Sequence, residues 1–330
     1  MRDNGTYSRR RFLALAAASA GVAGCTSGDG GTTVPESGTE PTTTPESEPE
    51  STPTRPGPDA PTTRIETVAD SGVEIRRNVT FREGEDWLLL ADIYLPESSN
   101  APFVVFAHGG GWFTGDKGRR PMHPAMAEAG IAVADVQYRL VPDFRYPAAV
   151  RDVAAAVRWV RANAADYGID ADRGALAGYS AGAHLAALVG LAPEHPNFQP
   201  EGFHPDEPVA VDAIVGYSGP YDFTVPGAGE NGMVAGFFGE DATDETLREG
   251  SPTTHVDAGD PPTLLVHGTA DNIVPYRSST LLATELERVG VPAEVLTGEG
   301  AGHGMIDSPE WREETIPTQR AFLREHLDLV

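Results

Sequence analysis

The chain has 330 residues, of which 40% are hydrophobic, so it can form one large domain or two small ones with a sizeable core. Its 49 acidic and 24 basic residues give a formal charge of −25 at pH 7. A surface of that sign repels nucleic acid and anionic lipid, which excludes both as direct partners.

Almost every basic residue is an arginine. Lys117 is the only lysine, while acidic residues outnumber basic ones by about two to one. Such an acid excess with so little lysine is typical of proteins that work in near-saturated salt, where ions screen the repulsion between carboxylates. We therefore expect a halophilic protein.

Residues 1–24 have the pattern of an export signal. Ser8–Leu13 matches the twin-arginine pattern, and the apolar stretch Phe12–Ala23 is much shorter than the roughly 20 residues that a membrane span needs. Val22–Cys25 resembles a lipobox, in which Cys25 becomes the lipid-modified N-terminus after cleavage. Because Cys25 is the only cysteine, we expect no internal disulfide and no cysteine-based metal site. The predicted product is an exported lipoprotein, anchored to the outer face of the cytoplasmic membrane.

Residues 25–63 consist mainly of Thr, Pro, Glu, Ser and Gly. With almost no large apolar side chain, this segment cannot bury enough surface to offset its chain entropy, and it is predicted to be a disordered stalk. The folded domain is predicted to occupy residues 64–330. Near its start, Asn78-Val79-Thr80 matches the N-glycosylation pattern.

The folded part alternates strands with helices. A hairpin-like pair of strands comes first, and six further strands follow, giving Glu74–Phe81, Trp87–Leu95, Phe103–Ala107, Ile131–Val136, Ala175–Tyr179, Val211–Tyr217, Thr263–His267 and Ala293–Thr297. Apolar periodicity predicts helices over Pro147–Ala165, Ala181–Leu191, Tyr276–Val289 and Pro317–Leu327. The alternation predicts an α/β fold with a mostly parallel sheet of about eight strands and helices on both faces.

Ser180 stands in the sequence Gly-Tyr-Ser-Ala-Gly, between a predicted strand and a predicted helix. In parallel sheets reactive groups lie at the carboxyl ends of strands, and the following helix points free N–H groups toward any anion that forms there. Gly178 and Gly182 allow a sharp turn and a close helix start. The alternative is a small residue that lets the helix pack tightly, but the strand–turn–helix setting favours a nucleophile.

A serine nucleophile needs a base and an orienting carboxylate. His303 lies in a glycine-rich loop beyond the last strand, whereas His184 is expected to pack or bond locally and His267 to shape the loop after its strand. Asp271 also follows a strand, and the chain order Ser, Asp, His is that of α/β-hydrolases. Asp222 is the alternative carboxylate.

Glycines also follow an earlier strand, in the sequence His-Gly-Gly-Gly-Trp from His108 onward. Glycine has no side chain to keep a backbone N–H away from a substrate carbonyl, and one such donor contributes about 3 kcal/mol to the transition state. We predict an oxyanion hole made by the amides of Gly110, Gly111 and Ala181, the residue after Ser180.

Together these segments resemble the α/β-hydrolase fold and, within it, the hormone-sensitive-lipase and feruloyl-esterase-like carboxylesterases. The resemblance covers residues 73–327 and rests on HGGGW, GYSAG, HGTADNIVP, GAGHGM and the stretch from Val136 to Asp170. It implies a triad of Ser180, Asp271 and His303 with the oxyanion bound at Gly110, Gly111 and Ala181. It also implies that His108 and Asp152 hold the glycine loop and the helix that follows.

The resemblance implies hydrolysis of a small-molecule carboxylic ester through an acyl-enzyme. Inserts at Ala192–Pro208 and Thr224–Asp260 stand where this fold builds a cap, and their shortness favours short acyl chains, beside aryl or sugar esters. One hypothesis is that Phe203, Phe237 and Phe238 line an acyl pocket, and the alternative is that they pack within the cap.

Two other functions remain open. A serine peptidase of the prolyl-oligopeptidase type shares the chain order, although a stalk rather than a propeller precedes this domain. The second open function is an inactive binding module on the same scaffold, but the complete set of triad residues argues against it. Nothing in the sequence resembles a nucleotide-binding loop or a metal-ligand cluster, so no cofactor is expected, and the membrane is a partner only through Cys25.

Overall fold

A computed structural model describes residues 63–68, 71–118 and 120–329. The predicted export signal, Cys25 and the predicted stalk apart from Thr63 lie outside the described residues. Within that part of the chain, no helix is both long and apolar enough to cross a bilayer.

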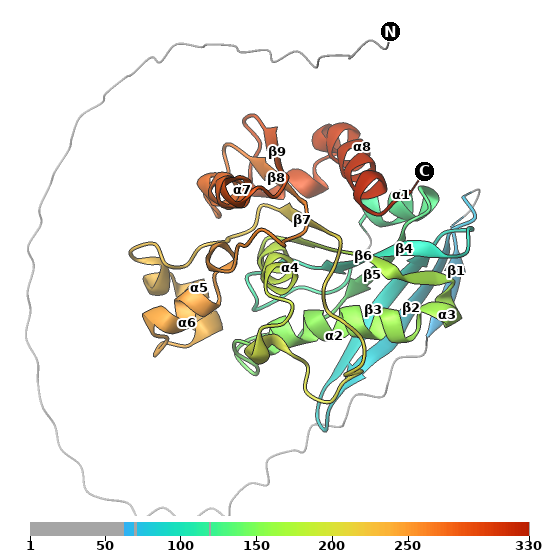
Figure 1. The fold of residues 1–330 in the computed structure, drawn as a ribbon, viewed down its shortest axis with the longest axis horizontal. Coiled ribbons are helices and arrows are strands. Elements are labelled where there is room, and N and C mark those ends of the chain that lie inside the picture. The colour runs from blue at the N-terminus through green and yellow to red at the C-terminus, as the bar shows by residue number, and fades with distance from the viewer. Residues whose placement is uncertain (1–62, 69–70, 119, 330) are drawn as a thin grey trace, which may run out of the picture. The chain divides into compact units, whose positions relative to one another are not determined.

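Among the described residues, one sheet of nine strands forms the centre of the fold, in the order β1-β2-β3-β5-β4-β6-β7-β8-β9 (Figure 1). Its strands are β1 Arg64–Thr67, β2 Glu74–Glu83, β3 Leu88–Leu95, β4 Ala101–Ala107, β5 Ala132–Val136, β6 Ile169–Tyr179, β7 Ala213–Tyr217, β8 Thr263–Gly268 and β9 Ala293–Gly298. In the sheet order from β5 to β9 all neighbours are parallel, whereas the pairs β1–β2, β2–β3 and β3–β5 are antiparallel. The mostly parallel sheet is confirmed. The strand that the sequence did not reveal, β1, is a four-residue edge strand whose one large apolar side chain, Ile65, is exposed.

The helices are α1 Met122–Glu128, α2 Ala148–Ala162, α3 Ala164–Tyr167, α4 Ala181–Leu191, α5 Gly232–Phe238, α6 Asp244–Glu249, α7 Arg277–Val289 and α8 Pro309–His326. Single 3-10 turns occur at η1 Pro196–Phe198, η2 Ala228–Glu230, η3 Pro252–Thr254 and η4 His303–Asp307.

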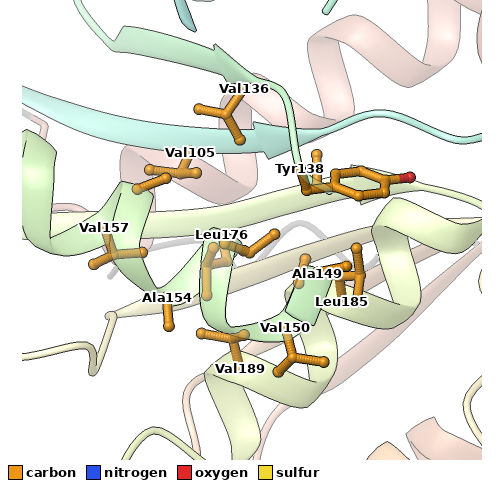
Figure 2. Packing of buried hydrophobic residues seen from close by; sticks show 14 of the residues in the cluster. Val105, Val136, Tyr138, Ala149, Val150, Ala154, Val157, Leu176, Leu185 and Val189 are labelled. Carbon is orange, nitrogen blue, oxygen red and sulfur yellow. The ribbon is translucent and has the colours of Figure 1, made fainter. Parts of the chain in front are cut away.

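Helices cover both faces of the sheet, as predicted. Residues of α2 and α4 pack on one face, and Figure 2 shows Val105 and Leu176 of the sheet facing Val157 of α2 and Val189 of α4. On the other face, Val104 and Phe106 of β4 join a cluster with α1 and α8. Successive side chains of a strand point to opposite faces, and because both faces are covered, β4 is buried along its whole length.

The last helix begins earlier than predicted. The sequence places its start at Pro317, but α8 begins at Pro309, after Ser308, and Pro317 lies inside it with its ring exposed. Proline is favoured at the first helical position, where its missing N–H has no partner anyway, and two prolines eight residues apart offer two such starts. The chain uses the first. The short α1 was not predicted, because its seven residues include a proline and span under two turns.

Candidate active site

Ser180 sits on the sharp turn between β6 and α4. Its backbone has φ 53° and ψ −117°, a conformation that a residue with a side chain rarely adopts. A Cβ on Gly178 would lie 2.3 Å from the backbone of Gly182, and one on Gly182 would lie 2.1 Å from the carbonyl oxygen of Ala107. The two glycines are therefore required for the start of α4 to approach the strands, which confirms the role predicted for them.

The structure brings Ser180, His303 and Asp271 together from three different connections. His303 Nε2 lies 2.9 Å from Ser180 Oγ, and His303 Nδ1 lies 2.7 Å from Asp271 Oδ2. Because a carboxylate only accepts hydrogen bonds, Nδ1 carries the proton and donates it to Asp271. The free lone pair of Nε2 then faces the Ser180 hydroxyl, which is the arrangement a general base needs.

The carboxylate of Asp271 is buried and fully paired. Its Oδ1 accepts from the backbone N–H groups of Ile273 and Val274, each at 2.9 Å, while Oδ2 accepts from His303. Burial by itself would raise the pKa of Asp271, but the hydrogen bonds from His303 and these two amides outweigh it and hold the pKa below its usual value. Asp271 is therefore an anion at neutral pH.

Asp222, the alternative carboxylate, does not reach His303. Its Oδ1 accepts from the backbone N–H and the hydroxyl of Thr224, at 2.8 and 2.6 Å, within its own loop. The loop after β7 therefore uses this side chain as a local cap of the turn. Of the two candidates, Asp271 is the one that the fold places against the histidine.

The glycine loop after β4 lines the same cavity as Ser180. Gly110 and Gly111 have φ values of 128° and 60°, and a Cβ on Gly110 would lie 2.0 Å from the carbonyl oxygen of Thr114. Ala181 is the first residue of α4, where backbone N–H groups have no partner within the helix. All three predicted oxyanion residues thus border the cavity into which Ser180 opens.

Side chains from the rest of the domain hold this loop. His108 Nδ1 donates to the carbonyl of Gly109 at 2.8 Å, and its ring stacks on Tyr138, whose hydroxyl donates to the carbonyl of His108 at 2.8 Å. Burial lowers the pKa of His108 to about 4, so it is neutral.

Beyond the loop, the only lysine, Lys117, is nearly buried and forms an ion pair with Asp92 at 3.0 Å.

Asp152 has the structural role that the resemblance implied. It is completely buried in α2 and accepts hydrogen bonds from the guanidinium groups of Arg82 and Arg139, at 2.5 and 2.8 Å. The backbone N–H of Arg139 donates to it as well, at 2.9 Å. The carboxylate thereby fixes the segment after β5 to α2.

His184 is completely buried and packs against aromatic rings, as one of the two expectations had it, but its hydrogen bonds are long-range and not local. Its Nδ1 accepts from Trp112 Nε1 at 3.2 Å, and its Nε2 donates to the carbonyl of Gly250 at 2.8 Å. These partners come from the glycine loop and the end of α6, because the first turn of α4 is buried between them. Burial lowers the pKa of His184 to about 4.

Two further residues at the site were not predicted. Tyr179, directly before Ser180, donates its hydroxyl to the backbone carbonyl of His303 at 3.1 Å. His267, predicted only to shape a loop, has its Nε2 3.0 Å from Asp271 Oδ2. The only signal in the sequence for a role of these two residues is their closeness to the triad in the chain: His267 precedes Asp271 by four residues, and Tyr179 is the residue directly before Ser180 in the serine motif.

A cavity of about 450 Å³ opens above Ser180 and His303. Trp112 and Tyr179 border it, together with Asn231, Met233 and Val234 at the start of α5 and Ile273 and Val274 after β8. Among the described residues, no group of three His, Cys, Asp or Glu side chains is arranged to hold a metal ion.

The two predicted cap inserts contact each other, since Asn197 of the first donates to Glu249 Oε2 of the second at 2.8 Å, but only the second reaches the cavity. The second insert, 224–260, carries α5 and α6 and supplies the cavity residues Asn231, Met233 and Val234. The first insert, 192–208, does not border this cavity, because arginines of α2 hold it: Arg151 donates to the carbonyl of Asn197 at 2.8 Å, and Arg158 donates to Gln199 Oε1 at 2.7 Å.

The hypothesis that Phe203, Phe237 and Phe238 line an acyl pocket is wrong. Phe237 is buried and stacks on Trp112 with ring centroids 4.6 Å apart, and Phe238 packs edge-on against Phe237. Phe203 lies beside the guanidinium of Arg82, away from the cavity. Phe237 and Phe238 fill the layer behind Trp112 of the glycine loop, so these two rings pack rather than line a pocket, which is the alternative given for them.

Comparison with known proteins gives a consistent result. The BD-FAE family model matches residues 91–286, which is more than half of the chain. Esterase LipC of Mycobacterium tuberculosis is 32% identical over 245 residues, which cover 69% of this chain and 59% of LipC. The chain thus spans about three fifths of the length of this curated relative.

Solved structures with the same fold cover the domain more completely. A truncated form of a carbohydrate esterase from gut microbiota superposes with a TM-score of 0.67 at 27% identity, covering 76% of this chain and 95% of the esterase. Thermogutta terrifontis esterase 2 with bound butyrate superposes with a TM-score of 0.65 at 26% identity, covering 77% of this chain and 94% of that protein. The α/β-hydrolase fold is confirmed.

Proposed function

The chain belongs to the BD-FAE family, and we propose that it is a serine esterase that hydrolyses carboxylic esters through an acyl-enzyme. One observation carries the proposal: the unbroken hydrogen-bonded series from Ser180 Oγ through His303 to the buried carboxylate of Asp271, with contacts of 2.9 and 2.7 Å. The esterase names of the relatives support the same reaction class.

In the first half-reaction, His303 Nε2 takes the hydroxyl proton as Ser180 Oγ attacks the ester carbonyl carbon. The carbonyl oxygen becomes an oxyanion, which the backbone N–H groups of Gly110, Gly111 and Ala181 stabilise. The bond to the alcohol oxygen then breaks, and the departing oxygen takes the proton from Nε2. Throughout, Asp271 holds the imidazole by its Nδ1–H and stabilises its positive charge.

In the second half-reaction a water molecule takes the place of the alcohol. His303 Nε2 removes its proton as the water oxygen attacks the acyl carbon, and the same amides bind the second oxyanion. The bond to Ser180 Oγ breaks and the serine regains a proton from Nε2, releasing the carboxylic acid. No other group needs to gain or lose a proton.

The proposed substrates are neutral esters with a short acyl chain, or with an aryl or sugar alcohol. The butyrate in the related T. terrifontis esterase and the carbohydrate esterase among the structural relatives are the supporting facts. Hydrolysis of p-nitrophenyl acetate and butyrate, beside acetylated sugars, measures this preference. Rapid hydrolysis of long-chain esters alone would contradict it.

Covalent labelling tests the nucleophile directly. A fluorophosphonate probe should label the wild-type protein, and Ser180→Ala should abolish both labelling and ester hydrolysis. Ser218→Ala is the matched control, since Ser218 is also buried, also follows a strand end and also has a positive φ, of 49°. Labelling that survives Ser180→Ala, or aminopeptidase activity without esterase activity, would overturn the proposal.

We further propose that the protein is exported and anchored by a lipid on Cys25, and that it works in high salt. The twin-arginine pattern, the lipobox and the formal charge of −25 support this. Expression in a halophilic host should place the wild type in the membrane fraction and Cys25→Ser in the medium. A wild-type protein that stays in the cytoplasm would contradict the export signal.

A further inference from the structure

A second cavity lies beside the catalytic one. It has a volume of about 480 Å³, and it shares Pro220, Asn231, Val234, Ile273 and Val274 with the catalytic cavity. Its other walls are the segment after β7, the 3-10 turn η2 and the outer side of α7. No step of the proposed mechanism uses this space.

The second cavity exposes apolar side chains to water. Among the described residues, five large hydrophobic side chains are exposed, and three of them border the two cavities: Met233, Ile273 and Leu281, at 44%, 55% and 36% exposure. Clusters of exposed aliphatic side chains in a concave surface mark ligand sites, because a ligand removes them from water.

The charges of the second cavity balance. Asp222 and Arg277 are the charged residues in its lining, and they carry opposite signs. A lining without net charge and with aliphatic walls favours a neutral, apolar occupant.

We propose that the second cavity binds an apolar arm of the ester whose carbonyl lies at Ser180. The substrate class is then neutral esters with one aliphatic or aryl arm that extends past Val234 and Ile273. This inference rests on the proposed esterase function and specifies which class of ester the protein hydrolyses. Leu281 is the residue that determines it most directly, because it lines the second cavity and not the catalytic one.

Leu281→Asp tests the proposal, with Ile65→Asp as the matched control on an exposed edge strand far along the chain. Two ratios of kcat/KM are measured: p-nitrophenyl octanoate against acetate, and hexyl acetate against ethyl acetate by acid release. Leu281→Asp should lower at least one ratio by about tenfold or more, because a charge replaces an apolar contact. Leu281→Ala should lower the same ratio less, and Ile65→Asp should change neither.

Equal losses for all four esters, or unchanged ratios in Leu281→Asp, would overturn the subsite while wild-type hydrolysis still supports the esterase function. A wild-type protein that hydrolyses no ester and takes up no fluorophosphonate would instead overturn the proposed function itself.

An independent observation concerns the far side of Asp271. His267 Nε2 lies 3.0 Å from Asp271 Oδ2 and 3.0 Å from the carbonyl oxygen of Val274, while its Nδ1 lies 2.7 Å from Ser279 Oγ. His267 and Ser279 are both completely buried. Oδ2 of Asp271 therefore has two imidazole partners, His303 on the side of the cavity and His267 on the side of α7.

The partners determine the tautomer of His267. A carboxylate and a carbonyl oxygen only accept, so Nε2 carries the proton, and Nδ1 accepts from the Ser279 hydroxyl. Burial lowers the pKa of His267, which keeps the ring neutral. Without the Ser279 hydroxyl, the ring could place its proton on Nδ1 and turn a lone pair toward the carboxylate.

We infer that His267, oriented by Ser279, is a positioning residue that holds Asp271 in line with His303. It acts through the carboxylate and touches neither Ser180 nor the cavity. This second inference also rests on the proposed function. It predicts that a buried serine hydroxyl on α7 affects the rate of the chemical step.

Ser279→Ala tests the inference, with Ser251→Ala as the control for loss of a completely buried serine hydroxyl elsewhere, where it bonds Phe223 and Leu247. Exhaustive fluorophosphonate labelling counts active sites, and kcat is expressed per labelled serine. Ser279→Ala should lower kcat by about tenfold or more with KM unchanged, because a change of the His267 tautomer removes the hydrogen bond from Nε2 to the charged carboxylate of Asp271. Ser279→Thr, which keeps the hydroxyl, should recover most of the loss.

An equal fall of kcat in Ser279→Ala and Ser251→Ala, or an unchanged kcat in Ser279→Ala, would show that the hydroxyl is merely structural. Absence of labelling in the wild type would count against the esterase proposal rather than against His267.

Discussion

Replacement of Asp271 by asparagine should disable His303 without disturbing substrate binding. Four N–H groups point at the carboxylate: two backbone amides at Oδ1, and His303 Nδ1 and His267 Nε2 at Oδ2. An amide has a single acceptor oxygen. If that oxygen keeps the backbone N–H groups, its NH2 group faces His303, which must then move its proton to Nε2.

A proton on Nε2 points at Ser180 Oγ, 2.9 Å away, so the imidazole can no longer act as a base. An orienting carboxylate of this kind is worth about 10⁴ in kcat, or roughly 5 kcal/mol of activation free energy. Because Asp271 does not border the catalytic cavity, KM should change by less than about threefold.

The assay is steady-state hydrolysis of p-nitrophenyl butyrate by Asp271→Asn and by Asp222→Asn, with folding checked by thermal melting. Asp222→Asn should lower kcat far less than Asp271→Asn does, because Asp222 bonds only its own loop among the described residues and borders the second cavity rather than Ser180. Comparable losses in the two variants, or a large loss only in Asp222→Asn, would refute the assignment of the carboxylate.

Three further expectations concern the glycine loop, acid stability and salt. Gly110→Ala should abolish esterase activity, because its Cβ would lie 2.0 Å from a backbone oxygen of the loop. Gly227→Ala should keep the activity, because Gly227 also has a positive φ but faces open space. An active Gly110→Ala would contradict the oxyanion role. Burial lowers the pKa of His108, His123 and His184 in the folded protein to about 4, 3 and 4. In the unfolded chain a histidine has a pKa of about 6.5, so below that pH the unfolded chain binds more protons than the folded protein does. The stability that these three histidines contribute is therefore complete above pH 6.5 and falls toward pH 4, by about 2 kcal/mol for each at pH 5. The free energy of unfolding in urea should differ less between pH 7 and pH 5 in His184→Gln than in the wild type. The melting temperature should rise between 0.1 M and 3 M KCl as the Debye length falls from about 10 Å to less than about 3 Å, and full stability in dilute buffer would contradict a halophilic protein.

Local patterns were sufficient to predict the features that depend on neighbours in the chain. Gly178 and Gly182 beside Ser180 indicated the turn, since only glycine leaves room for the helix start. The apolar runs of β4 and β6 predicted buried parallel strands, because a strand covered on both faces has no polar side. His303 and the glycine loop were recognisable for a similar reason: each lies in a loop that follows a strand, and parallel strands end at one edge.

The choice between Asp271 and Asp222 required the tertiary structure. Both follow neighbouring parallel strands, so no spacing along the chain separates them, and only the direction of each loop places one carboxylate 2.7 Å from His303. The contact of His267 with the same carboxylate, the packing of Phe237 behind the glycine loop and the cavity beside α7 were decided in the same way. The contact of His267 depends on how the loop after β8 folds back onto its own strand, and the other two features join side chains that are far apart in the chain. A hydrophobic pattern records which face of an element is buried but not which partner it meets.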